Sequence, residues 1–127
     1  MASALERWIT GYLKAWNSNE PSDIAALFSE TAEYRSYPWA TPAVGPQAIV
    51  ALWLSGADEA GDHEFTWHPL GEDRGRHFVQ GRTVYADGRV YENLWIIDLD
   101  GDGRCGRFTE WYMESASKPL GPGATLR

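Results

Sequence analysis

A change of hydrophobic period divides this chain into an N-terminal helical part and a C-terminal β part. Between Leu5 and Trp16 the apolar residues recur three to four positions apart, the spacing of one face of an amphipathic helix. From His63 onward apolar and polar residues tend to alternate, which is typical of strands with one buried face. Helices gathered before the strands indicate an α+β domain with its helices packed on one face of an antiparallel sheet.

Three helices are expected in the first part. The first covers residues 5–16, and a short second helix begins at Pro21 with Phe28 on its buried side. A third helix begins at Gly45-Pro46 and ends near Gly56.

Five strands are expected to form the sheet. A short one, residues 33–37, places Tyr34 and Ser36 on the same face and ends at Pro38. Four further strands are expected at residues 63–71, 76–86, 89–99 and 104–114.

The dipeptide Asp87-Gly88 predicts a two-residue hairpin, which pairs Arg82 with Asn93. In this register one face of the sheet carries Gln80, Arg82, Val84, Tyr91, Asn93, Trp95 and Ile97. The opposite face then carries a row of exposed apolar residues: Val79, Tyr85, Val90, Leu94 and Ile96. Because an exposed apolar surface of this kind favours association, a homodimer formed through this face of the sheet is expected.

Length and charge exclude several classes of protein. The 127 residues suit a single domain over residues 1–114, followed by a mobile tail at 115–127. A net charge of −7 without basic runs argues against nucleic acid or an anionic membrane as a partner. The N-terminus lacks the apolar core of a signal peptide, and the single Cys105 excludes an internal disulfide. A cytoplasmic protein is expected.

The segment DLDGDG, residues 98–103, has the spacing with which a calcium-binding EF-hand loop begins. The twelfth position, where such a loop needs an acidic ligand, is Thr109, and Glu110 follows one place late. The flanking segments are expected strands, so the run is interpreted as a hairpin turn that aligns the last strand. No metal site and no cofactor are expected, since the histidines also lack metal-ligand spacing.

Three stretches resemble the SnoaL-like, or nuclear-transport-factor-2-like, superfamily: YLKAWNSNEPSDIAALFSETAEYRSYP, GPQAIVALW, and the strand after Gly-Asp-Gly-Arg. The resemblance implies three helices on a curved, mainly antiparallel sheet that encloses a pocket, a cystatin-like cone. Isomerases, cyclases, epoxide hydrolases, dehydratases and binding proteins share this fold, so it does not by itself assign a function.

The ketosteroid isomerase branch of the superfamily can be laid over this chain. Its oxyanion-binding tyrosine falls on Tyr12, its general-base aspartate at or beside Ser36, and its second oxyanion donor on Trp95. Because both carboxylates are missing, steroid isomerisation by that mechanism is not expected. The pocket-facing positions of the last strand are Phe108, Glu110 and Tyr112.

Glu110 is the strongest candidate for chemistry. Desolvation in an aromatic cavity would raise its pKa unless a cation compensates, and Arg82 is the expected cation. With Asn93 and Tyr12 as hydrogen-bond donors, Glu110 could act as general acid or base. The alternative is a structural Glu–Arg pair that closes the cavity.

An unusual number of aromatic residues indicates a flat apolar pocket, although core packing is the commoner role of each residue alone. The expected lining consists of Trp16, Tyr34, Ser36, Trp53, Tyr91, Trp95, Phe108 and Tyr112. The leading hypothesis is a cofactor-free enzyme that performs proton-transfer chemistry on a hydrophobic cyclic or carbonyl metabolite. A binding module for a small apolar molecule and a protein-binding domain are the alternatives.

Overall fold

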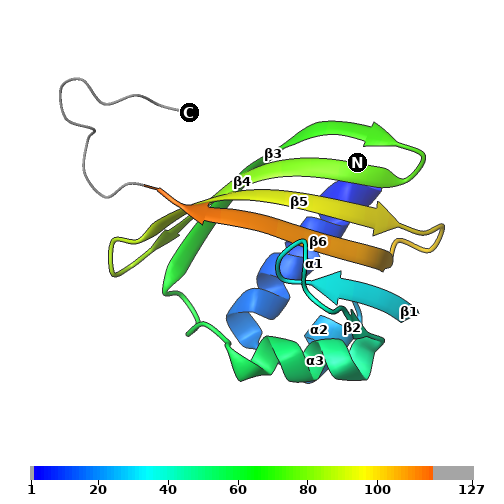
Figure 1. Ribbon diagram of the computed structural model, residues 1–127, viewed down its shortest axis with the longest axis horizontal. Helices are drawn as coiled ribbons and strands as arrows, with labels where there is room; N and C mark the ends of the chain where they lie inside the picture. Colours follow the sequence, from blue (N-terminus) through cyan, green and yellow to red (C-terminus); the bar gives the residue numbers. More distant parts are fainter. Residues whose placement is uncertain (1, 116–127) are drawn as a thin grey trace.

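The computed structural model describes residues 2–115 and confirms the α+β class (Figure 1). The expected tail, apart from Ser115, lies outside the described residues. No helix among residues 2–115 combines the length and the apolar character needed to cross a membrane. In chain order the elements are α1 (Ala4–Ser18), α2 (Pro21–Ala25), β1 (Phe28–Arg35), β2 (Ala43–Val44), α3 (Pro46–Ser55), β3 (His63–Asp73), β4 (Arg76–Tyr85), β5 (Val90–Leu99) and β6 (Cys105–Glu114).

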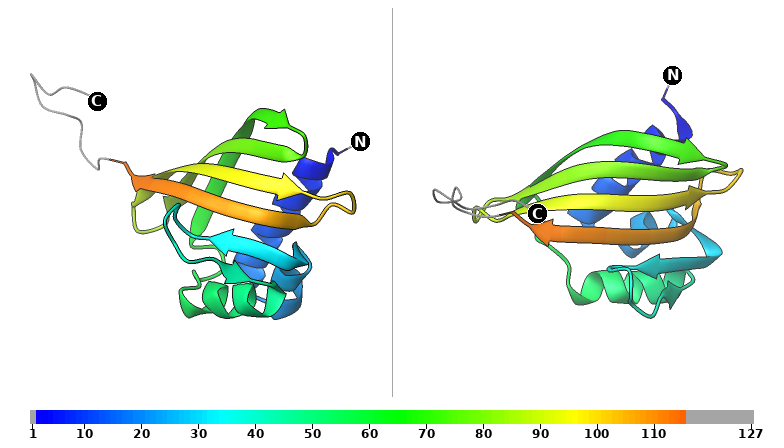
Figure 2. Two further views of the ribbon diagram at one scale, coloured as in Figure 1. Left: turned by 45° about the vertical axis from the view of Figure 1, so that its right-hand side comes forward. Right: turned by 45° about the horizontal axis from the view of Figure 1, so that its top comes forward.

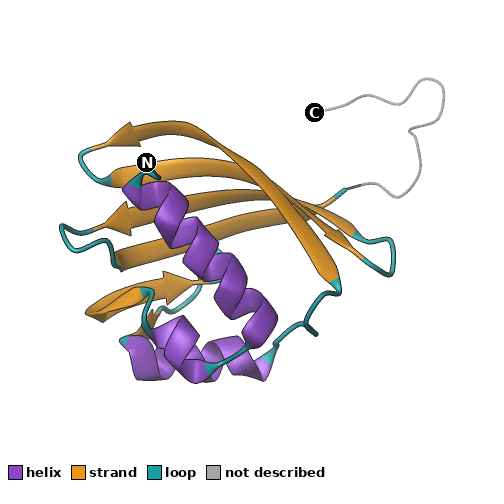
Figure 3. Cartoon of the chain, turned by 180° about the vertical axis from the view of Figure 1, so that it is seen from behind, coloured by secondary structure: helices purple, strands orange, loops and turns teal. Residues whose placement is uncertain are grey.

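The six strands form one curved sheet in the order β2-β1-β6-β5-β4-β3. All neighbouring strands are antiparallel except β1 and β6, which run parallel. Helix α1 crosses the concave side of the sheet, and α2 and α3 lie toward the edge formed by β1 and β2 (Figures 2 and 3). The arrangement confirms the expectation of three helices packed on a curved, mainly antiparallel sheet.

Helix α1 is defined at both ends by local interactions. Ser3 and Glu6 form a reciprocal capping box at its start, and Asn19 adopts a left-handed conformation at its end. Its apolar face turns toward the sheet, where the indole Nε1 of Trp8 donates to the carbonyl oxygen of Leu27 at 2.9 Å. These contacts fix the helix that carries Tyr12.

An aromatic cluster joins α1 to the sheet. Phe108 on β6 is fully buried and stacks on Tyr34 of β1 at a centroid distance of 4.9 Å. Tyr12 lies 4.5 Å from Trp95 and 5.7 Å from Phe108 between ring centroids. Burial of such large side chains is the main source of stability available to a domain of this size.

The second helix is shorter than expected. Helix α2 ends at Ala25, and Phe28, assigned to its buried side, is the first residue of β1. Phe28 is nevertheless buried, because β1 pairs there with Cys105 of β6. The proline-rich loop that follows β1 contains β2, a two-residue strand absent from the expected elements.

The hairpin between β4 and β5 differs from the expected two-residue turn. The amide of Tyr85 donates to the carbonyl oxygen of Arg89, so Ala86, Asp87 and Gly88 form a three-residue loop. Gly88 has a φ of 95°, the left-handed conformation that this loop requires and that glycine adopts without strain. Asn93 therefore pairs with Gly81, and Arg82 pairs with Glu92.

A shift of one residue turns the whole of β4 over, because side chains alternate between faces. The prediction that Gln80, Arg82 and Val84 share a face with Asn93 is wrong: all three are exposed on the outer face. Val79 and Tyr85, expected on the outer face, instead face inward. The assignments on β5 hold, with Asn93, Trp95 and Ile97 buried and Val90, Leu94 and Ile96 on the other face.

The DLDGDG segment forms the expected hairpin turn between β5 and β6. One oxygen of the Asp100 carboxylate accepts from the amides of Asp102 and Arg104 at 3.2 and 3.0 Å. Asp102 pairs with Arg104, and Asp98 pairs with Arg76. The Asp100 and Asp102 carboxylates stabilise the turn, and the Asp98–Arg76 pair joins β5 to β4. The strand after the turn places Glu110 opposite Trp95.

Gly81 on β4 makes room for an aromatic ring on the concave face. A Cβ atom at this position would collide with the tip of the Phe65 ring. That ring cannot move freely, because it stacks on Trp95 at 4.6 Å with an interplanar angle of 12°. We expect Gly81→Ala to lower the free energy of unfolding by about 1–3 kcal/mol.

Gly71→Ala is the matched control, since Gly71 lies on β3 and a Cβ there meets no atom within 4 Å. Urea denaturation of both variants should show a loss of stability for Gly81→Ala and little change or a slight gain for Gly71→Ala. Equal stabilities would contradict the placement of Phe65 over Gly81.

Candidate functional site

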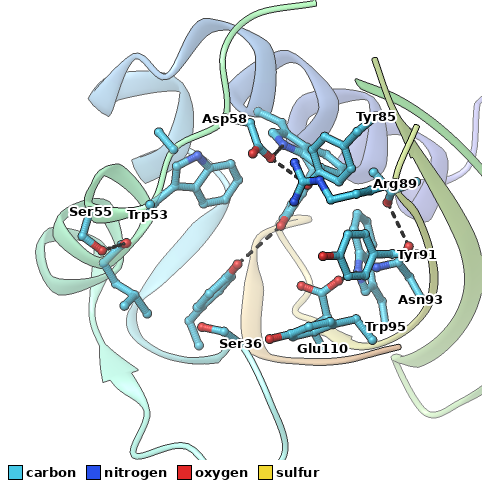
Figure 4. A pocket seen from close by; sticks show the side chains of 18 residues that line it. Ser36, Trp53, Ser55, Asp58, Tyr85, Arg89, Tyr91, Asn93, Trp95 and Glu110 are labelled. Carbon is cyan, nitrogen blue, oxygen red and sulfur yellow. Dashed lines mark hydrogen bonds between the residues drawn. The ribbon is translucent and has the colours of Figure 1, made fainter. Parts of the chain in front are cut away.

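A cavity of about 420 Å³ opens between the helices and the concave face of the sheet (Figure 4). Its lining is rich in tyrosine and tryptophan, with two carboxylates and one guanidinium among them. The lining residues are Tyr12, Trp16, Tyr34, Ser36, Leu52, Trp53, Ser55, Gly56, Ala57, Asp58, Thr83, Tyr85, Arg89, Tyr91, Asn93, Trp95, Glu110 and Tyr112.

Glu110 is held in this cavity by two hydrogen bonds to the same oxygen. Its Oε2 accepts from Nδ2 of Asn93 at 2.7 Å and from the indole Nε1 of Trp95 at 3.1 Å. Within residues 2–115 no hydrogen bond reaches Oε1. One carboxyl oxygen is therefore fixed in position and the other remains available to a ligand.

Burial raises the pKa of Glu110 above its ordinary value of 4.5, while the hydrogen bonds from Trp95 and Asn93 oppose the shift. No ion pair to Glu110 is present within the described residues. Arg82, the expected cation, lies on the outer face, where its Nε donates to Glu92 at 2.9 Å. That expectation is wrong, because the three-residue loop turns Arg82 away from the cavity.

Thr83 controls the orientation of the amide that binds Glu110. Its hydroxyl donates to Oδ1 of Asn93 at 2.8 Å, and Asn93 Nδ2 then points to Glu110. Thr83 is 2% exposed, so its hydroxyl depends on this acceptor. Thr83 was not among the residues expected in the cavity, although a three-residue hairpin loop ending in Gly88 would have turned it inward.

Two tyrosine hydroxyls meet at the helical side of the cavity. The oxygens of Tyr12 on α1 and Tyr34 on β1 lie 3.4 Å apart. Burial is the main cause that raises the pKa of both phenols, so each stays protonated at neutral pH. The pair can donate a hydrogen bond to an oxygen of a bound molecule.

Asp58, in the loop between α3 and β3, joins two walls of the cavity. Its Oδ2 accepts from the Trp16 indole and from the Tyr85 hydroxyl, each at 2.9 Å. Burial, followed by the bond to Asp58, raises the pKa of the Tyr85 phenol. Asp58 was not identified from the sequence, because a carboxylate in a polar loop carries no local signal of its distant partners.

Arg89 was also missed by the sequence analysis. It follows the hairpin loop, and its guanidinium carbon lies 4.4 Å from the centre of the Tyr85 ring. Its Nε donates to the Asp87 carboxylate, with 2.8 Å to the nearer oxygen. The expected two-residue turn gave no indication that this side chain borders the cavity.

Most of the expected lining is present. Phe108 is the exception: it is fully buried in the aromatic core and is not a lining residue. Tyr112 lies at the rim with 53% of its surface exposed. The predicted residues that border the cavity are Tyr12, Trp16, Tyr34, Ser36, Trp53, Tyr91, Asn93, Trp95, Glu110 and Tyr112.

Residues 2–115 contain no group of three or more His, Cys, Asp or Glu side chains placed to hold a metal ion.

The sequence pattern of the SnoaL-like domain matches residues 9–111. A search of curated proteins finds no match. Solved structures show the same fold. An NTF-2 like protein of unknown function from Burkholderia xenovorans LB400 is 15% identical with a TM-score of 0.69, over 94% of this chain and 88% of that one.

Two further structures agree with this fold. A steroid delta-isomerase from Pseudomonas aeruginosa is 17% identical with a TM-score of 0.61, covering 89% of this chain and 82% of its own. An uncharacterized protein with a cystatin-like fold from Silicibacter pomeroyi DSS-3 is 15% identical with a TM-score of 0.62, covering 84% and 73%. With the matched sequence pattern covering most of its length, the chain belongs to the SnoaL-like domain family.

Proposed function

We propose that this protein is a small enzyme that performs proton-transfer chemistry on a hydrophobic cyclic or carbonyl compound, with Glu110 as its acid or base. The observation that carries the proposal is the state of the Glu110 carboxyl. It is half-buried in an open cavity, has no cationic partner among the described residues, and accepts no hydrogen bond at Oε1 from residues 2–115. A structural carboxylate would instead be paired with a cation.

The surroundings of Glu110 suit a general acid or base. A raised pKa brings a carboxyl closer to neutral pH, where it can both accept and return a proton. Asn93 and Trp95 hold Oε2, so the proton would move through Oε1. The Tyr12–Tyr34 pair could donate to a carbonyl oxygen on which negative charge develops.

The reaction would differ from the one inferred for the ketosteroid isomerase branch by the position of its carboxylate. A structural neighbour is named a steroid delta-isomerase, and proton transfer beside a carbonyl is consistent with that name. In this chain Ser36 and Trp95 occupy the two expected carboxylate positions, and the carboxyl comes from β6. Cyclisation, isomerisation, dehydration and hydrolysis all remain within this class of chemistry.

Proton exchange on a simple ketone tests the proposal without knowledge of the natural substrate. We expect the protein to accelerate deuterium incorporation beside the carbonyl of 2-tetralone, a flat bicyclic ketone, followed by NMR in heavy water. Glu110→Gln keeps the size of the side chain and its acceptor oxygen but cannot take up the proton. It should reduce the protein-dependent rate by about 100-fold or more.

Glu92→Gln is the matched control, because Glu92 lies on the same sheet but pairs with Arg82 on the outer face. This variant should exchange at the wild-type rate. Binding of the ketone with no acceleration, or equal rates for wild type and Glu110→Gln, would favour the binding-module alternative.

Glu110→Gln should also stabilise the fold at neutral pH. The folded carboxyl has a raised pKa, whereas the unfolded chain ionises near 4.5, so the contribution of Glu110 to folding is fully present below 4.5. That contribution is lost as pH rises through the raised pKa, because only the unfolded state gains a well-solvated carboxylate. Gln stays neutral throughout.

Urea denaturation between about pH 4 and about pH 8 measures this difference. Wild type and Glu110→Gln should have similar free energies of unfolding at the acidic end, with a growing advantage for the variant as pH increases. A difference that stays constant with pH would contradict a raised pKa in the folded protein.

We also propose that the outer face of the sheet mediates a homodimer. A groove of about 680 Å³ on this face is lined by apolar side chains that include Trp39, Leu70, Trp111 and Met113. Trp39 is 82% exposed and Met113 is 70% exposed. Association with a second copy would remove these apolar side chains from water. The face presents the same groove to a second copy and so suits a two-fold interface.

Sedimentation at micromolar concentration should give twice the monomer mass. Met113→Lys should shift the equilibrium toward monomer, because a charge would be buried at the interface. Val44→Lys, a substitution of an exposed apolar residue on β2, should leave it unchanged. A monomeric wild type would contradict the dimer.

A further inference from the structure

We propose that Arg89 forms an anion subsite at the mouth of the cavity, and that the ligand is a flat apolar molecule with one carboxylate group. This inference rests on the proposed function, because it assigns the two ends of the ligand to two sites in the same cavity. The carboxylate end would lie at Arg89 and the uncharged end, where the reaction occurs, at Glu110.

The guanidinium of Arg89 is positioned before any ligand arrives. The Asp87 carboxylate accepts its Nε–H at 2.8 Å, and the ring of Tyr85 lies against its plane, 4.4 Å from the guanidinium carbon. Asp87 is itself fixed, because its Oδ1 also accepts the backbone amide of Arg89 at 3.0 Å. The side chain is directed toward the cavity (Figure 4).

The Nη edge of this guanidinium is not used by Asp87, because both hydrogen bonds to Asp87 come from Nε. The pKa of the guanidinium is raised first by Asp87 and then by the Tyr91 side chain, which lies close enough to act as a hydrogen-bond partner. By contrast, Arg76 uses both Nε and Nη2 to bind Asp98. The Nη donors of a planar guanidinium match the oxygens of a carboxylate, and the neighbouring Tyr91 side chain would share that edge with the ligand.

The other charges of the cavity determine which way such a ligand would lie. Asp58 already accepts two hydrogen bonds from the cavity wall, and Glu110 is half-buried without a cation among the described residues. A ligand carboxylate beside either group would be repelled or left unpaired. Arg89 is the one cationic residue among those that line the cavity, so the anionic end belongs there.

The walls between these two ends favour a flat apolar body. The rings of Tyr12, Trp53, Tyr91 and Trp95 line the same cavity as Arg89 and Glu110. A volume of about 420 Å³ lies toward the small end of the range for ligand pockets and suits a bicyclic or tricyclic molecule.

The test compares 2-naphthoate with 2-naphthamide, which share one ring system and differ in charge. Titration calorimetry at low salt should show about five- to tenfold tighter binding of the naphthoate to wild type. Arg89→Met, which keeps much of the apolar stem, should abolish this preference while still binding the amide. Arg82→Met is the matched control, since Arg82 also pairs through Nε but lies on the outer face, and it should retain the preference.

Each outcome bears on the subsite. Equal affinities of wild type for the two probes, absence of binding by both, or a preference that survives in Arg89→Met would overturn it. Glu110→Gln should keep the preference for naphthoate, since the anion lies at the other end of the cavity. If Glu110→Gln loses proton exchange but still prefers naphthoate, then Glu110 is needed for the reaction and Arg89 for binding of the carboxylate.

Discussion

The three-residue loop between β4 and β5 determines what the cavity of this protein contains. The Tyr85–Arg89 hydrogen bond, with Gly88 in a left-handed conformation, sets the register of the two strands. In this register Gly81 and Thr83 face inward and Arg82 faces outward. A loop one residue shorter would reverse both assignments, because side chains alternate along a strand.

The β4–β5 register affects the residues around Glu110 and those at the mouth of the cavity. Gly81 leaves space for Phe65, which packs on Trp95, and Trp95 in turn donates to Glu110. Thr83 orients the Asn93 amide toward the same carboxyl oxygen. On the mouth side, Tyr85 anchors Asp58, and its ring supports the guanidinium of Arg89. The register set by this turn therefore determines which of these side chains pack, form hydrogen bonds or carry charge in the cavity.

The cavity contains Arg89 and not the expected Arg82, and this difference determines the electrostatics around Glu110. An arginine beside Glu110 would have favoured the carboxylate and lowered its pKa. With Arg82 paired to Glu92 on the outer face, burial dominates and the pKa of Glu110 rises. The positive charge lies instead at the mouth. The proposed proton transfer depends on the raised pKa of Glu110, and the proposed anion subsite depends on the cation at Arg89.

The sequence was sufficient to predict the order of the elements other than β2, the inward positions of β6 and ten residues that line the cavity, because periodicity and turn residues act locally. It failed where one residue decides a register: Asp87-Gly88 is compatible with loops of two or three residues, and strand geometry alone distinguishes them. It also could not reveal Asp58, whose partners Trp16 and Tyr85 come from distant segments. Phe108 shares a face with Glu110, but the packing of α1 covers it.

The most direct measurement is a pH titration of the side-chain carboxyl carbon of Glu110 by NMR, in the protein without ligand and with Glu110→Gln to identify the signal. An acid or base held in a desolvated cavity should titrate with a midpoint above 4.5, the ordinary value for this group. A midpoint at or below that value would show a well-compensated carboxylate and would contradict the role proposed for Glu110.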